Sequence, residues 1–210
     1  MTSGALVLAD GETFAGTVIG ASNTIAIGEV VFNTAMTGYQ EIATDPSYAG
    51  QIVAMTASHI GNYGTNAGDA QAQRAWCTGF ITRSLSRRDS SWRSEGSFVT
   101  WLHDRGVVGL TDVDTRRLTR YLRDRGAMPG AIGARPAGEL HAAARAAPTM
   151  DGRDLTGAVT TQNRYRVDPD GAARGRVVAI DFGLKRDILT ALTQRGLAVD
   201  VVPSDTTAED

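Results

Sequence analysis

Short apolar runs separated by polar turns fill the first part of the chain. Residues 5–9 and 13–19 predict two strands, because the Asp-Gly pair between them is a hairpin turn signal. Residues 30–32 and 52–55 are two further runs, β-branched and aromatic in the first and apolar in the second. The segment between these last two runs is polar, and its Asp-Pro-Ser sequence at 45–47 is strong turn chemistry. We therefore expect a shaped surface between two buried strands.

Short strands and helices alternate up to about residue 150. Strands are predicted at 76–81 (around Cys77), 107–110 and 131–134, helices at 97–105, 114–125 and 139–146, and loops at 20–27 and 82–95. The helix at 114–125 places Leu118, Tyr121 and Leu122 on one face, and Thr111 or Asp112 can cap it.

The pattern changes after residue 150. Residues 152–175 show no clear period, and the composition of VDPDGAARGR is that of a linker. Residues 177–181 form a continuous apolar run, which is typical of a buried parallel strand. A helix follows Gly183, with Leu184, Ile188, Leu189 and Leu192 on one face, and residues 198–202 return as a second strand. This is one β-α-β unit, right-handed by default. Ser204 or Asp205 then looks like the cap of another helix.

Composition and charge exclude several classes of protein. A hydrophobic content of 42% and a charged content of 21% are ordinary for a globular protein, and a net charge of −2 gives no general reason to expect nucleic acid or a membrane as partner. The basic loop 82–95 and the arginine-rich helix 114–125 are the two candidate nucleic-acid surfaces. No aromatic platform supports the loop, and acidic residues interrupt the helix, so solvated or partner-facing surfaces fit both better. The single cysteine and the lack of a signal peptide or long apolar segment predict a cytoplasmic protein.

The strings EVVFNTAMTGYQEIATDPSYAGQIV, HIGNYGTN, DVDTRRLTRYLRDRG and VVAIDFGLKRDIL together closely resemble the small, glutamine-hydrolysing subunit of carbamoyl-phosphate synthase. The resemblance covers the whole chain, and the chain ends before the region where that family keeps its catalytic cysteine. It implies an α/β protein overall: an α+β N-terminal domain at 1–150, a linker at 151–175, and at 176–210 the truncated start of a class I glutamine amidotransferase domain.

The resemblance also implies a function. Such a subunit hydrolyses L-glutamine and passes ammonia to a large synthetase subunit, which uses bicarbonate, ATP and Mg to form carbamoyl phosphate for pyrimidine and arginine synthesis. No cofactor is expected in this chain itself. The alternative is a non-catalytic module that keeps only the surface for docking the large subunit. The nucleotide sequence past codon 210, or the mass of the natural protein, separates the two.

Each candidate site residue also has a possible structural role. The family uses a cysteine on a strand-to-helix elbow together with histidine, and AWCTGF reads instead as a strand in which Cys77 is a small buried hydrophobe. His59, His103 and His141 show no ligand spacing, so neither a metal site nor a catalytic residue is predicted. Within the DPSY match the resemblance assigns Ser47 to the glutamine pocket. The alternative for Ser47 is a turn or cap serine whose hydroxyl is satisfied by the backbone.

Overall fold

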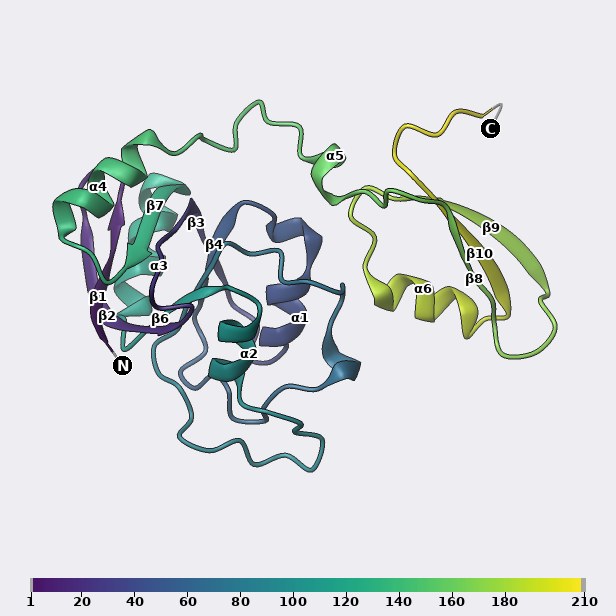
Figure 1. Ribbon diagram of the computed structural model, residues 1–210, viewed down its shortest axis with the longest axis horizontal. Helices are drawn as coiled ribbons and strands as arrows, with labels where there is room; N and C mark the ends of the chain where they lie inside the picture. Colours follow the sequence, from purple (N-terminus) through teal and green to yellow (C-terminus); the bar gives the residue numbers. More distant parts are fainter. Residues whose placement is uncertain (1, 209–210) are drawn as a thin grey trace.

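A seven-stranded closed barrel forms the larger part of the molecule in the computed structural model, which describes residues 2–208. The strands follow the order β1-β2-β6-β5-β4-β3-β7 around the barrel. Their bounds are β1 Thr2–Leu8, β2 Thr13–Gly20, β3 Ala26–Asn33, β4 Gln51–Met55, β5 Gly79–Ile81, β6 Val108–Thr111 and β7 Met128–Gly133. Figure 1 shows the barrel on the left and a second, smaller sheet on the right.

Antiparallel and parallel pairings are combined in the barrel. The β1–β2 hairpin pairs Leu6 with Phe14, and these two side chains enter the barrel core. The pairs β3–β4, β4–β5 and β5–β6 are parallel. Parallel neighbours require crossover connections, and these connections carry the helices next to the candidate site.

Three helices close the faces of the barrel. Helix α3 (Thr115–Arg125) places Leu118 and Leu122 in the barrel core, and α4 (Ala137–Ala146) covers β1 and β7 with Leu140 and Ala144. Helix α2 (Phe98–Asp104) belongs to a second cluster, whose aromatic members include Tyr39, Phe80 and Phe98. This cluster also contains residues of α1 (Tyr39–Thr44), so aromatic packing against α2 holds α1 in place.

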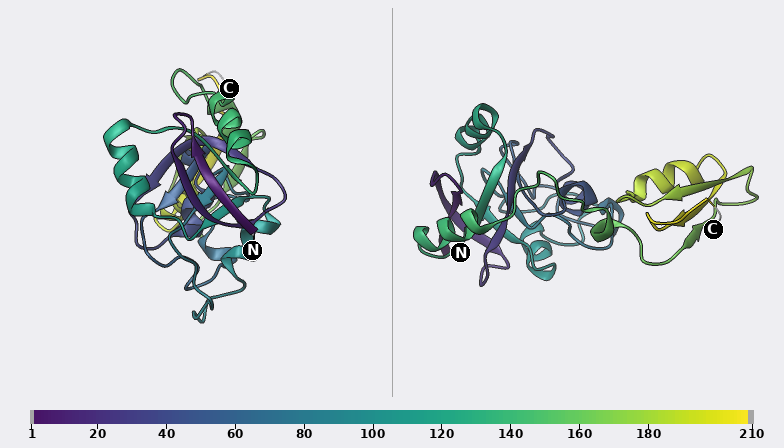
Figure 2. Two further views of the ribbon diagram at one scale, coloured as in Figure 1. Left: turned by 90° about the vertical axis from the view of Figure 1, so that its left-hand side faces the viewer. Right: turned by 90° about the horizontal axis from the view of Figure 1, so that it is seen from above.

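A three-stranded sheet with the order β8-β10-β9 forms the smaller part. Strands β9 (Gly175–Ile180) and β10 (Leu197–Val202) are parallel and are connected by α6 (Arg186–Thr193). Strand β8 (Tyr165–Val167) pairs antiparallel with β10, and the short helix α5 (Thr156–Val159) precedes it. Both Figure 1 and the right-hand view of Figure 2 show this sheet projecting away from the barrel.

Several predicted elements have different bounds or neighbours. Strand β5 begins at Gly79, so Cys77 does not lie within a strand; the N–H groups of Trp76 and Cys77 instead bond the carbonyl of Ala43. The predicted loop at 20–27 ends early, because β3 starts at Ala26. Helix α1 and strand β8 were not predicted, since each is too short to show a period.

Three expectations for particular residues are wrong. Asp114, and neither Thr111 nor Asp112, caps α3 by accepting from the N–H of Arg117. Strand β9, expected to be buried, is exposed on one face. Residues 204, 205 and 208 lie in turns, and no helix begins within residues 204–208. The last two residues of the predicted helix, 209 and 210, lie outside the described residues.

Candidate functional site

The Asp-Pro-Ser turn is a fixed structure at the end of α1. Asp45 precedes the 3₁₀ helix η1 (Pro46–Tyr48), and its Oδ1 accepts a hydrogen bond from the N–H of Ser47 at 2.9 Å. Pro46 is at the first helical position, where its fixed φ is already suitable and its missing N–H costs nothing. Asp45 therefore provides the cap. The hydroxyl of Ser47 is exposed and makes no hydrogen bond to any of residues 2–208.

A second loop, residues 181–185 after β9, lies against this turn. The buried carboxylate of Asp181 accepts from the N–H groups of Gly183 (2.8 Å) and Leu184 (2.6 Å), which curls the backbone back on itself. Gly183 has a φ of 98°, and a Cβ added there would lie 2.9 Å from Cβ of Pro46. Only glycine fits both the conformation and the contact.

An ion pair also joins the two loops. Nζ of Lys185 lies 3.3 Å from Oδ2 of Asp45, so the same carboxylate that caps the Ser47 turn also binds a lysine from the smaller part. A groove of about 1290 Å³ runs beside this junction, and Pro46 lines it while Ser47 lies outside it. Residues of both parts line the groove, including Gln71, Trp76, Trp101, Asp181, Leu184 and Leu189.

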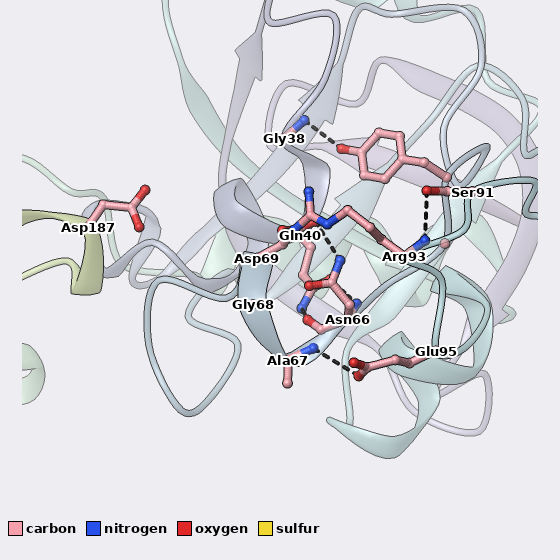
Figure 3. A network of polar contacts seen from close by, with 12 residues as sticks. Gly38, Gln40, Asn66, Ala67, Gly68, Asp69, Ser91, Arg93, Glu95 and Asp187 are labelled. Atoms are coloured by element: carbon pink, nitrogen blue, oxygen red, sulfur yellow. Dashed lines mark hydrogen bonds and ion pairs between the residues drawn. The ribbon is translucent and has the colours of Figure 1, made fainter. Parts of the chain in front are cut away.

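A network of polar contacts holds α1, the helix that precedes the Ser47 turn, in place (Figure 3). The hydroxyl of Tyr63 accepts from the N–H of Gly38 at 2.6 Å, at the start of α1. The side-chain amide of Gln40 donates to the carbonyl of Asn66 (2.6 Å) and accepts from its N–H (3.0 Å). Asn66 in turn donates to Asp69, which pairs with Arg93. The loop at 66–71 is thereby joined to α1.

Burial changes the proton affinities of several groups in this network. Burial raises the pKa of Glu41, and the nearby carboxylates of Asp69 and Asp187 raise it further. Burial likewise raises the pKa of Tyr39 and of Tyr63, so both phenols stay neutral and serve as hydrogen-bonding groups. The hydroxyl of Tyr39 donates to the carbonyl of Gly64 at 2.6 Å.

Cys77 and the three histidines are not brought together. Cys77 is buried in the aromatic cluster, and burial raises the pKa of its thiol to about 12. His59 contacts Ser84, His103 contacts Asp104, and His141 contacts the carbonyl of Ala9. Across the described residues, no group of three or more His, Cys, Asp or Glu side chains is arranged to hold a metal ion, and none of the helices has the length and apolar character of a membrane span.

The fold and the site define the class of protein. It is a closed barrel followed by a smaller, partly parallel α/β sheet, and the two parts meet at the turn that Pro46 fixes. Residues 6–132 match the family model described as "Carbamoyl-phosphate synthase small chain, CPSase domain". The chain belongs to the carbamoyl phosphate synthase small chain family.

Curated relatives extend the match over nearly the whole chain. The carbamoyl phosphate synthase small chain of Xanthomonas campestris is 46% identical over 217 residues, covering 96% of this chain and 57% of that protein. Those of Pseudomonas aeruginosa and Streptomyces avermitilis are 47% and 45% identical, each over 98% of this chain and over 58% and 55% of their own lengths. The chain thus spans less than three-fifths of these relatives.

Sequence reasoning selected Ser47 and missed the residues that position it. The sequence pattern predicts only a turn at Asp45, whereas the structure shows that Asp45 is both the cap and the acceptor for Lys185. The apolar run predicts a strand that ends at Asp181 and does not reveal the two hydrogen bonds by which Asp181 shapes the following loop. The signal for Asp45 was present, because Asp before Pro at a helix start is a capping pattern.

Proposed function

We propose that this chain acts in glutamine-dependent carbamoyl phosphate formation, as the part of the small chain that binds the large synthetase chain and completes the glutamine site. In this proposal glutamine is hydrolysed and the ammonia passes to the large chain, which uses bicarbonate, ATP and Mg to make carbamoyl phosphate for pyrimidine and arginine synthesis. Membership of the family and the identity to small chains of three bacterial species support it.

The observation that carries the proposal is the state of Ser47. Its hydroxyl is exposed and unpaired among the described residues, and its backbone is fixed by the cap bond from Asp45. A hydroxyl in this state is a pre-set donor or acceptor for a small polar ligand, and glutamine offers an α-carboxylate and an α-ammonium. A turn or cap serine with a structural role is the alternative, and the kinetic test below separates the two.

The smaller part is, in this proposal, the first unit of a class I glutamine amidotransferase domain. Parallel strands β9 and β10 connected by α6 support this assignment. The barrel would then serve mainly to dock the large chain. The catalytic cysteine and histidine are not among residues 1–210 in this proposal, because the thiol of Cys77 is buried in an apolar cluster and its pKa is raised far above neutrality.

The test is the kinetics of glutamine use by the Ser47→Ala variant of the small chain assembled with its large chain. Losing a hydrogen bond to a charged ligand group costs about 1.5–3 kcal/mol, which corresponds to a rise in KM of roughly tenfold to more than a hundredfold. The contact would be remote from the scissile amide, so KM should rise more than kcat falls.

The matched control is Ser22→Ala, which removes another exposed hydroxyl, located in the loop before β3. It should leave KM unchanged. If Ser47→Ala lowers the melting temperature and leaves KM for glutamine unchanged, then Ser47 has only a structural role and the proposed site is wrong.

A further inference from the structure

Helix α6 begins without a cap of its own. Lys185 occupies the N-cap position and makes no side-chain hydrogen bond to the helix. The first N–H groups of a helix have no intrahelical acceptor, so those of Arg186 and Asp187 need partners from elsewhere. Both partners come from a single residue, Gln71, which lies in the loop that follows η2 (Ala67–Asp69).

Gln71 forms three hydrogen bonds with the start of α6. Its backbone carbonyl accepts from the N–H of Arg186 at 2.9 Å, and its Oε1 accepts from the N–H of Asp187 at 3.2 Å. Its Nε2 donates to Oδ2 of Asp187 at 2.7 Å. The side-chain amide of Gln71 thus accepts from the backbone of Asp187 and donates to its carboxylate, although the two residues are 116 positions apart in the sequence.

Gln71 itself is held firmly by the larger part of the molecule. It is 7% exposed, and its N–H donates to Oγ1 of Thr44 at 2.8 Å. Thr44 is the last residue of α1 and directly precedes Asp45, the cap of the Ser47 turn. The bonds from Asp187 through Gln71 to Thr44 therefore end one residue before Asp45, whose carboxylate caps the Ser47 turn.

Polar contacts, and not a shared apolar core, join the two parts here. Leu189 and Leu192 of α6 pack with Val199 and Val201 of β10, and the three clusters of the larger part include no residue beyond Ala144. Further polar contacts at this junction are those of Arg186, which donates to the carbonyls of Ala67 (3.0 Å) and Gly68, and the ion pair of Lys185 with Asp45. Gly183 also lies directly against Pro46. In Figure 3, Asp187 lies on the side of the smaller part, facing the network around Asp69.

We propose that Gln71 is a positioning residue: it caps α6 from the other part of the molecule and so fixes the 181–185 loop relative to Ser47. The inference rests on the proposed function for its consequence, because a site assembled from two parts of a chain depends on their relative placement. A displacement of about 1 Å at such a site can lower reactivity a hundredfold. Gln71 and Asp187 need not touch the ligand.

Three variants test the pair. Gln71→Glu places a carboxylate opposite that of Asp187, whereas Asp187→Asn keeps an acceptor for the Gln71 amide. The double variant Gln71→Glu/Asp187→Asn reverses donor and acceptor, restores all three bonds and keeps the net charge of the wild type. Asp170→Asn, a change at an exposed aspartate outside the junction, is the control.

Hydrogen exchange of α6 in the 210-residue chain measures the cap directly. We expect exchange in α6 to be about tenfold faster or more in Gln71→Glu, near wild type in Asp187→Asn and in the control, and restored in the double variant. Wild-type exchange in Gln71→Glu, or failure of the double variant to restore it, overturns the cap.

The KM for glutamine of the assembled synthase measures the consequence. Gln71→Glu should raise KM and the double variant should return it. If Ser47→Ala raises KM while Gln71→Glu leaves it unchanged, the positioning role is wrong and the proposed function stands. If Ser47→Ala leaves KM unchanged, the proposed function fails, and the exchange experiment still decides the cap.

Discussion

At the scale of the residue, Glu41 has a buried carboxylate oxygen without a partner among the described residues. It lies in the first turn of α1, where Oε2 is excluded from solvent. Burial is the main reason why its pKa is raised, and the charges of Asp69 and Asp187 act in the same direction, while Arg93 opposes them. Ionised Glu41 is therefore a local cost at neutral pH, at the same junction that Gln71 caps.

The sign of the pH effect follows from linkage. Because the pKa of Glu41 is higher in the folded state than its ordinary value of 4.5, the folded protein holds this proton more tightly than the unfolded chain. The contribution of Glu41 to stability is thus fully present below pH 4.5 and is lost as the pH rises through the folded pKa.

Glu41→Gln should therefore raise the melting temperature at about pH 7 and leave it unchanged near pH 3.5, where both side chains are neutral. Melting curves of wild type and variant over this range measure the difference. Glu139→Gln, at an exposed position in the first turn of α4, is the control and should not stabilise the protein at either pH. Equal melting temperatures for Glu41→Gln and wild type at neutral pH would contradict this account.

At the scale of the element, β9 is an edge strand of the smaller sheet with an exposed apolar face. It lies at an edge, paired only with β10, and its outward side chains Val178, Ile180 and Phe182 (which directly follows it) are 62%, 47% and 63% exposed. An edge strand leaves backbone groups unpaired, and an apolar face exposed to water gains nothing from burial.

We expect the amides of residues 177–202 to exchange faster than those of 30–32 in a monomeric sample. Within the sheet, β10 is the internal comparison for β9, because it lies between β8 and β9 and its four alanine and valine side chains are buried. Hydrogen exchange or limited proteolysis gives the result. Protection of β9 equal to that of the barrel strands would show that the exposed face does not weaken the sheet.

At the scale of the whole molecule, the proposal predicts that residues 1–210 alone do not hydrolyse glutamine. Groups that act together in covalent catalysis lose nearly all activity when one is missing. Cys77 cannot substitute for the nucleophile, because it is buried and protonated at neutral pH. The measurement is ammonia release from glutamine by the purified chain, with Cys77→Ser as the comparison. Activity that Cys77→Ser abolishes would overturn both statements.

Much of the secondary structure could be predicted from local pattern. Helix α3 shows why: Leu118 and Leu122 recur at helical spacing, and Gly126 ends the helix. Helix α1 and strand β8 could not be predicted in this way, because six and three residues are too few to reveal a period. They form because aromatic packing fixes α1 and because β10 offers β8 an edge.

The sequence by itself determined the family, the strands of the barrel as separate runs, and Ser47 as a candidate, since each depends on residues close together in the chain. Only the tertiary structure decided that seven of the strands close into a barrel, that Asp45 both caps the Ser47 turn and binds Lys185, and that Gln71 caps a helix that begins 115 residues later. Strand pairing and capping between distant segments depend on which surfaces meet in space, and no local spacing of residues records that.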